Sequence, residues 1–141
     1  MQISEEQAKG IPVLPMRLDG TEGEGQRAIV VGYPTGLAAL LARASSDTLA
    51  DLRQNAASTA DAIEQLAAAR QIKPVITLGV ISNTEAHVIA YDAGTTSGGS
   101  GGPVFSNKGD VIAVNFAIQR NFAGNNLGVP IRYALELLQK K

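Results

Sequence analysis

The chain has 141 residues, 45% of them hydrophobic, and a net charge of −1, which suits one domain with its own hydrophobic core. It contains no cysteine, and this excludes thiolate nucleophiles, cysteine-ligated zinc and disulfides. Lysine and arginine are scattered and only 4% of residues are aromatic, so no nucleic-acid-binding surface is indicated. No apolar run approaches the roughly 20 residues that cross a bilayer, and the acidic start lacks the apolar stretch of a signal peptide. We therefore expect one soluble domain over residues 1–141, without a membrane segment.

The first part of the chain predicts a single buried strand. Residues 1–10 are a polar lead-in, and residues 11–18 alternate but are interrupted by proline, which permits an edge strand at most. Residues 27–33 form a β-branched run that stops at Pro34. Such a run is typical of a buried strand.

The pattern then changes to a helical one over residues 37–71. The stretch begins with residues that favour helices. Ser46 or Asp47 can cap a second helix, and Ser58, followed by Asp61, resembles a capping box that opens a third. We expect helices only in this block and at the C-terminus.

Strand patterns return after the helical block. β-Branched or alternating runs cover residues 75–81, 85–91, 103–105, 110–117 and 127–131. Residues 133–138 have helical spacing and precede two lysines, which suit a helix C-terminus. Short strands with hairpin-like turns and no β-α-β alternation predict a mainly β fold, a small antiparallel barrel, with a helical segment inserted at about residues 37–73 and a C-terminal helix.

Residues 98–103, with the sequence Gly-Gly-Ser-Gly-Gly-Pro, carry the sharpest chemical signal in the chain. Glycines on both sides of Ser100 allow a substrate backbone to approach its hydroxyl. They also permit a strained turn that points two backbone N–H groups at one spot. Such a pair can stabilise the oxyanion of a tetrahedral intermediate. The segment therefore predicts a nucleophilic serine.

Other interpretations of this loop fit less well. A flexible linker is disfavoured by the predicted strands on both sides and by Pro103. A phosphate-binding loop needs Gly-Lys followed by Ser or Thr, and no lysine occurs between Lys73 and Lys108. A Gly-x-Ser-x-Gly elbow is formally present, but it should open a helix, whereas Pro103 begins a predicted strand.

Residues 98–103 resemble the Gly-(Asn/Asp)-Ser-Gly-Gly-Pro signature of chymotrypsin-fold, trypsin-like serine proteases. The context is most similar to the Deg/high-temperature-requirement branch. Further similar segments follow in the family's order, over roughly residues 11–36 and 74–138: Gly32-Tyr33-Pro34-Thr35-Gly36, Thr77-Leu78-Gly79-Val80-Ile81-Ser82, Tyr91-Asp92-Ala93, Gly109-Asp110-Val111-Ile112-Ala113-Val114-Asn115 and Gly128-Val129-Pro130-Ile131. The resemblance implies a six-stranded antiparallel barrel, one lobe of a protease.

The resemblance also implies a serine-type endopeptidase that hydrolyses peptide bonds of a polypeptide substrate in an intact parent protein, with no cofactor or metal. Ser100 would be the nucleophile, and the N–H groups of Ser100 and Gly98 would form the oxyanion hole. A periplasmic or extracytoplasmic location is favoured on the same ground. The residues expected to meet the substrate are Asn115, Phe116 and Ala117, on a strand that pairs with its backbone, and Gly94 and Thr95, at the mouth of the specificity pocket.

The family pattern places a catalytic histidine and aspartate on a preceding barrel, and residues 1–99 do not resemble one. His87, the single histidine, is expected to be an ordinary strand or surface residue, and Asp92 to fix the loop. A serine without a base is a poor nucleophile, so we expect the isolated chain to be inactive and to associate with an N-terminal barrel of its parent or with itself. The alternative is a non-catalytic pseudo-protease or peptide-binding module.

Overall fold

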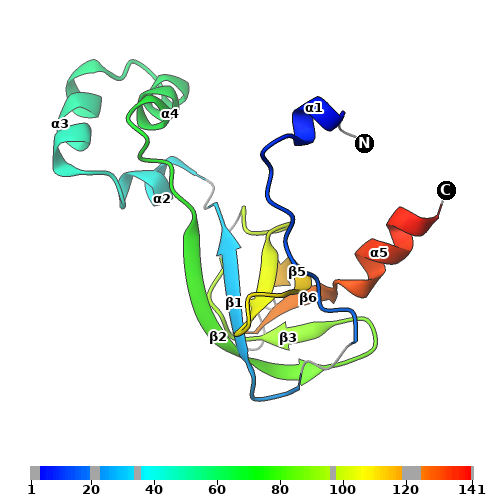
Figure 1. Cartoon of the computed structure of the whole chain (residues 1–141). Helices are drawn as coiled ribbons and strands as arrows, with labels where there is room; N and C mark the ends of the chain where they lie inside the picture. The colour runs from blue at the N-terminus through cyan, green and yellow to red at the C-terminus, as the bar shows by residue number, and fades with distance from the viewer. Residues whose placement is uncertain (1–3, 20–22, 34–35, 96–97, 119–124, 141) are drawn as a thin grey trace.

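Six antiparallel strands close into a barrel (Figure 1). The computed structural model describes all residues except 1–3, 20–22, 34–35, 96–97, 119–124 and 141. Around the barrel the order is β1-β2-β3-β6-β5-β4, and β4 pairs back with β1. This confirms the expected mainly β, trypsin-like barrel. The strands are β1 (Arg27–Gly32), β2 (Val75–Thr84), β3 (Ile89–Tyr91), β4 (Pro103–Ser106), β5 (Val111–Ile118) and β6 (Asn126–Pro130).

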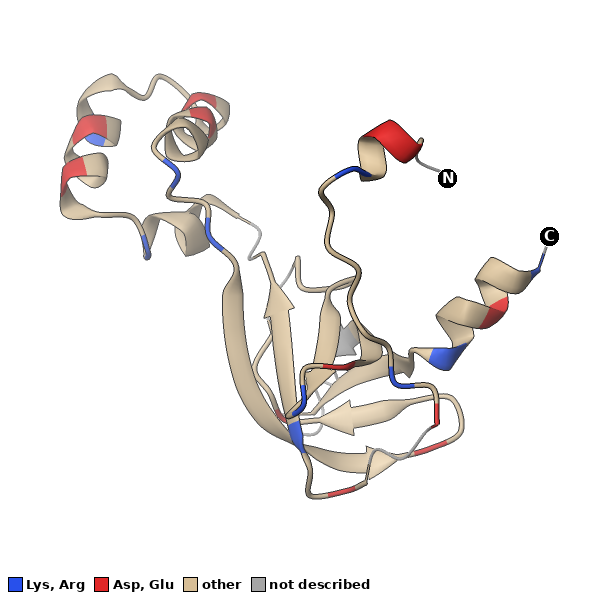
Figure 2. Cartoon of the chain, in the orientation of Figure 1, with Lys and Arg blue, Asp and Glu red and all other residues tan. Residues whose placement is uncertain are grey.

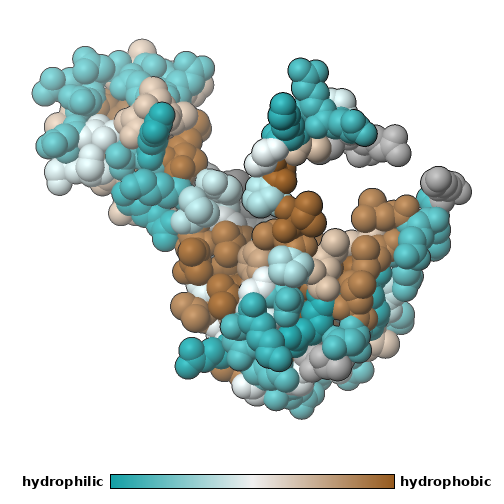
Figure 3. Space-filling view, viewed as in Figure 1, coloured by the Kyte–Doolittle hydropathy of each residue, from teal (hydrophilic) through white to brown (hydrophobic). Residues whose placement is uncertain are grey.

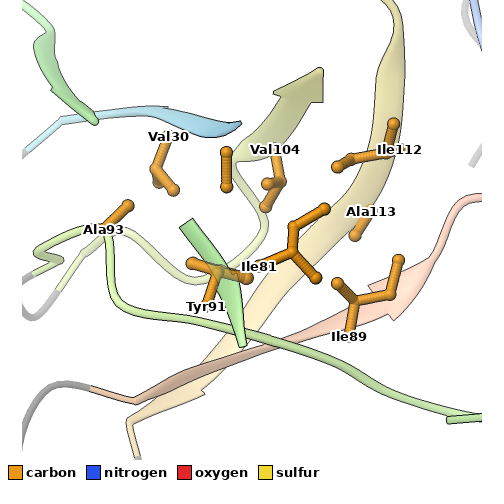
Figure 4. Packing of buried hydrophobic residues seen from close by; sticks show 9 residues of the cluster. Val30, Ile81, Ile89, Tyr91, Ala93, Val104, Ile112 and Ala113 are labelled. Carbon is orange, nitrogen blue, oxygen red and sulfur yellow. The ribbon is translucent and has the colours of Figure 1, made fainter. Parts of the chain in front are cut away.

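The barrel interior is filled by side chains that alternate along the strands. In β1, Ala28 and Val30 are buried while Ile29 lies half outside, as the period of two in a strand requires. Small residues take positions where the interior of a six-stranded barrel is narrow, and burying each larger aliphatic side chain contributes about 1.5–3 kcal/mol. Figure 4 shows this cluster, which consists of Ala28, Val30, Ile81, Ile89, Tyr91, Ala93, Val104, Ile112 and Ala113.

The helical insertion lies between β1 and β2 and comprises α2 (Leu37–Leu41), α3 (Ser46–Asn55) and α4 (Thr59–Ala68). The predicted capping of α4 is confirmed, because the Ser58 hydroxyl accepts the N–H of Asp61 at 3.1 Å. The Asp61 carboxylate in turn accepts the N–H of Ala57, and this bond, with a second from Gln65, holds the pKa of Asp61 below its usual value. Both longer helices of the insertion, α3 and α4, thus begin at a serine whose side chain caps the helix.

Three boundaries differ from the sequence-based predictions. The cap of α3 is Ser45, whose hydroxyl accepts the N–H of Thr48, not Ser46 or Asp47, because Ser45 is the last residue with extended backbone. A short helix, α1 (Glu5–Ala8), lies outside the expected helical regions; Ser4 and Gln7 close a capping box there. The predicted strand at 85–91 begins only at Ile89, because the chain turns between β2 and β3.

The two ends of the chain contact the barrel differently. Residues 11–18 make one isolated parallel bridge, between Met16 and Val111, and Arg17 pairs with Asp110 at 3.0 Å. The expected C-terminal helix is present as α5 (Arg132–Gln139), beside β6. Among the described residues, no helix is long and apolar enough to cross a membrane.

Candidate active site

The loop between β3 and β4 presents Ser100 to solvent. Its hydroxyl donates to the carbonyl oxygen of Phe116 at 3.3 Å. The loop is fastened to β5 by two backbone bonds, from the Gly101 N–H to the Asn115 oxygen at 2.7 Å and from the Asn115 N–H to the Gly102 oxygen at 2.9 Å. Strand β4 follows at Pro103, as predicted, and no helix begins at the serine. The nucleophile candidate is therefore exposed on an anchored loop.

Glycine is required around Ser100 for two different reasons. Gly98 and Gly101 have φ values of 94° and 87°, which residues with a side chain rarely adopt. At Gly102 the obstacle is space, because a Cβ there would lie 2.6 Å from the carbonyl oxygen of Val31. The Gly-Gly-Ser-Gly-Gly pattern thus follows from the tight path of the backbone.

Two backbone N–H groups of the loop have no acceptor within the described part of the chain. Among the described residues, neither the N–H of Ser100 nor that of Gly98 donates to an acceptor of the chain. Exposed donors of this kind are what an oxyanion requires for stabilisation.

The predicted substrate strand lies next to the serine. Strand β4 pairs with β5 only as far as Val114, so beyond that point β4 no longer covers this side of the β5 backbone. Phe116 sits at a register shift between β5 and β6 and is 47% exposed. Ala117 belongs to β5, but its side chain falls outside the described part. Among the described residues, β5 therefore has no strand paired with it on the β4 side after Val114, and the serine loop bonds the N–H and the oxygen of Asn115 there.

Asn115 has a different role from its neighbours, because its side chain is buried. Its Oδ1 accepts the Tyr91 hydroxyl at 2.7 Å, and its Nδ2 donates to Thr95 Oγ1 at 3.3 Å. Burial raises the pKa of the Tyr91 phenol well above its usual range, so the phenol stays a neutral donor. This network links the barrel core to the loop that carries Ser100.

Gly94 and Thr95 lie at a small cavity behind the loop. The Gly94 oxygen accepts the Thr77 hydroxyl at 2.5 Å. Ser100 is not among the residues that line this cavity. Its volume is about 230 Å³, and the residues around it are Val30, Gly32, Tyr33, Val75, Thr77, Gly94, Thr95 and Gly99, none of them charged.

His87 and Asp92 are both engaged away from Ser100. His87 is an exposed surface residue, which is one of the two places expected for it, and lies in the turn before β3 rather than in the strand predicted over residues 85–91. Its Nδ1 is 2.6 Å from the Tyr133 hydroxyl on α5. The Asp92 carboxylate accepts the N–H of Val80 at 2.5 Å, which agrees with a loop-fixing role. Among the described residues, no cluster of histidine, aspartate or glutamate suits a metal ion. Charged residues of both signs are scattered over the helices and turns (Figure 2).

Apart from Asp92, the residues that position the loop were not given that role in the sequence analysis. Besides Tyr91 and Thr77, Asn126 donates from its buried Nδ2 to the oxygen of Ala93 at 2.6 Å. Gly79 lies against the same segment. A Cβ at this position would lie 2.1 Å from the backbone nitrogen of Ala93, so a side chain does not fit there. Alternation along β5 does place Asn115 on the face of the buried Ala113, and that signal alone could have shown that its side chain points inward.

The comparisons with known proteins agree with this geometry. A family model described as a trypsin-like peptidase domain matches residues 1–114. The HhoA protein of Synechocystis sp., named as a candidate serine protease, is 28% identical over 130 residues, which are 92% of this chain and 27% of that protein. This chain therefore spans about a quarter of the length of that relative.

The fold comparison points the same way. The crystal structure of the serine endoprotease from Yersinia pestis matches with a TM-score of 0.64 and 19% identity, over 94% of this chain and 36% of that chain. At that identity the likeness shows the fold. With the family model covering most of the sequence, the chain belongs to the trypsin-like peptidase domain family.

Proposed function

We propose that this chain is the nucleophile-bearing lobe of a serine endopeptidase and that Ser100 attacks the carbonyl carbon of a substrate peptide bond. The observation that carries the proposal is the exposed Ser100 on an anchored glycine loop, two of whose N–H groups have no acceptor among the described residues. In this proposal residues 1–141 form one barrel domain, and the helical segment at about 37–73 is an elaboration of it.

The reaction follows the chemistry of acyl transfer. A base removes the proton of the Ser100 hydroxyl as its oxygen bonds to the carbonyl carbon, and the negative charge on the carbonyl oxygen is stabilised by the N–H groups of Ser100 and Gly98. The base then gives the proton to the leaving amine, and water releases the acyl group from the serine. The Phe116 carbonyl, which now accepts the hydroxyl proton, is too weak a base for this task.

The substrate backbone would lie along β5. Beyond Asn115, whose backbone is bonded to the serine loop, β5 has no paired strand on the β4 side among the described residues, and an extended peptide can add to such an edge through main-chain hydrogen bonds. Phe116 and Ala117 would pair with the substrate, while the buried Asn115 holds the strand in place. Gly94 and Thr95 would lie near the specificity pocket.

The base would come from a second lobe. The imidazole of His87 is bonded to Tyr133, and the carboxylate of Asp92 to Val80, so we assign neither to the serine. A hollow of about 340 Å³ adjoins the loop at Gly101, lined by apolar residues of the lead-in segment and of β4 and β5. Apolar surface left uncovered in this way favours a partner.

Hydrophobic side chains are exposed on both the lead-in segment and α5. Val13 is 91% exposed and Leu137 and Leu138 of α5 are 72% and 75% exposed, and Figure 3 shows hydrophobic surface on both the lead-in segment and α5. A histidine- and aspartate-bearing barrel of the parent protein seated here would stand beside Ser100. Self-association of the chain over this surface is the other arrangement that covers it.

The proposal is tested by casein cleavage. The intact parent should degrade casein, whereas the isolated chain should retain at most the residual catalysis of an oxyanion hole and binding alone, about 10³–10⁴-fold over water. Rapid cleavage by the isolated chain would contradict the assignment of the base to another lobe.

A second candidate function is a peptide-binding pseudo-protease. It is favoured by the engagement of both His87 and Asp92 away from the serine. An intact parent that binds casein without cleaving it, at neutral pH and in the absence of inhibitors, would select this alternative.

A further inference from the structure

The helical insertion folds around a core that belongs to it alone. Leu40, Leu52, Ala62 and Leu66 are buried together, with other side chains of the same segment packed around them. Within the described part of the chain, α2 and α3 pack against α4, and none of the three makes an extensive contact with a strand. The insertion is thus attached to the barrel mainly through its two connecting segments (Figure 1).

An open apolar groove of about 670 Å³ lies between these helices, lined mainly by leucine and alanine side chains that include Leu37, Leu41, Leu49, Leu52 and Ala56. Its volume falls within the range of about 300–1,000 Å³ that is usual for ligand sites. Figure 3 shows hydrophobic residues between the hydrophilic outer sides of these helices. A groove formed between helices and lined by aliphatic side chains suits the apolar face of another helix.

Arg53 is the single charged residue among the described residues that line the groove. Among the described residues it forms no ion pair. The N-terminus of α4, which also borders the groove, is already capped by Ser58 and Asp61. An occupant must therefore complement the positive charge of one guanidinium group, and a carboxylate has the charge to do this.

The insertion leaves the barrel at the end that carries the serine loop. Strand β1 ends at Gly32, where a Cβ would lie 3.3 Å from the Cα of Gly99, the residue before Ser100. Tyr33 and Val75, at the two connections to the insertion, line the same cavity as Gly99. A polypeptide held in the groove is thereby tethered at the end of the barrel that carries the serine loop.

We propose that this groove is an exosite for protein substrates, and that it binds an amphipathic helical segment with a carboxylate beside its apolar face. The proposal rests on the proposed peptidase function. A second copy of the chain is the competing occupant, because its α5 (Arg132–Gln139) carries the exposed Leu137 and Leu138 beside Glu136, and the sedimentation experiment below separates the two. Binding here would raise the local concentration of the substrate at Ser100.

The test uses the full chain with Ser100→Ala, so that peptide binding is measured without cleavage. Its outcome therefore does not depend on whether the proposed peptidase function is correct. The probe is a fluorescein-labelled helical peptide with leucines spaced i, i+4 and i+7 and one glutamate beside them, and its twin has lysine in place of the glutamate. Fluorescence anisotropy should show saturable binding of the glutamate peptide. Arg53→Glu should weaken that binding about tenfold and should make the lysine peptide the tighter ligand.

Two further variants separate groove binding from general effects. Arg43→Glu makes the same charge change within the insertion, but Arg43 does not line the groove. This variant should therefore bind the glutamate peptide within about twofold of the affinity of the Ser100→Ala chain. Leu49→Gln, at a half-buried lining position outside the insertion core, should weaken binding about three- to tenfold while leaving the helical circular dichroism unchanged.

Three results would overturn the proposal. They are the absence of saturable binding up to about 1 mM peptide, an equal loss of binding in Arg43→Glu and Arg53→Glu, and self-association of the unmodified chain in sedimentation that Arg53→Glu abolishes. The last result would assign the groove to a second copy of the chain.

Discussion

Replacing Ser100 by alanine is expected to lower the kcat/KM of the intact parent on a peptide substrate by about 10⁴- to 10⁶-fold. The substitution removes the atom that we propose attacks the carbonyl carbon, and leaves the glycine loop and its N–H groups in place. Binding of substrate should persist, so the loss should fall on kcat. Steady-state hydrolysis of a fluorogenic peptide measures both constants.

Ser46→Ala provides the matched control. Ser46 is also an exposed serine, at the start of α3 in the insertion, and its replacement should leave kcat/KM within about twofold of the parent value. A Ser100→Ala variant that keeps most of its activity would rule out Ser100 as the nucleophile.

Gly79→Ala is expected to lower the free energy of unfolding by about 3 kcal/mol or more. A Cβ at this position would lie 2.1 Å from the nitrogen and 2.5 Å from the Cα of Ala93, and 2.4 Å from Oδ1 of Asp92. Two of these are backbone atoms, so relief requires that β2 or the segment after β3 move. Urea unfolding followed by circular dichroism measures the change.

Gly94→Ala is the control for this effect. A Cβ on Gly94 would meet no atom within 4 Å, and the φ of Gly94 lies outside the left-handed region. The unfolding midpoint of this variant should therefore stay close to that of the unsubstituted 141-residue chain. Equal stabilities for the two variants would show that the close approach of β2 to Ala93 is not maintained in solution.

The barrel could be predicted from the sequence where each strand carries its own signal. The β-branched run that becomes β1 stops at Pro34, and β4 begins at Pro103 directly after the serine loop, so residue type and the flanking glycines and prolines marked both strands. The glycine loop was recognisable for a similar reason, because the positive φ of Gly98 and Gly101 is a local demand of the backbone, whereas the need for Gly102 comes from the distant Val31.

Features that depend on contacts between distant residues could not be predicted in this way. Alternation continues through residues 85–91 and hid the turn at His87, which is fixed by pairing of β2 with β3 and by the contact with Tyr133 on α5. The groove of the insertion arises from how α2, α3 and α4 pack, and helix propensity does not reveal that packing. The position of Arg53 at this groove could therefore not be predicted from the sequence.

The central claim is that Ser100 is a nucleophile whose base lies outside this chain, and labelling by a fluorophosphonate probe at neutral pH tests it most directly. Such probes react with a serine hydroxyl only when a neighbouring base activates it. The account predicts that the intact parent is labelled on the peptide that contains Ser100, that Ser100→Ala abolishes this labelling, and that the isolated 141-residue chain is not labelled. Strong labelling of the isolated chain, lost on His87→Ala, would contradict the account and identify His87 as the base.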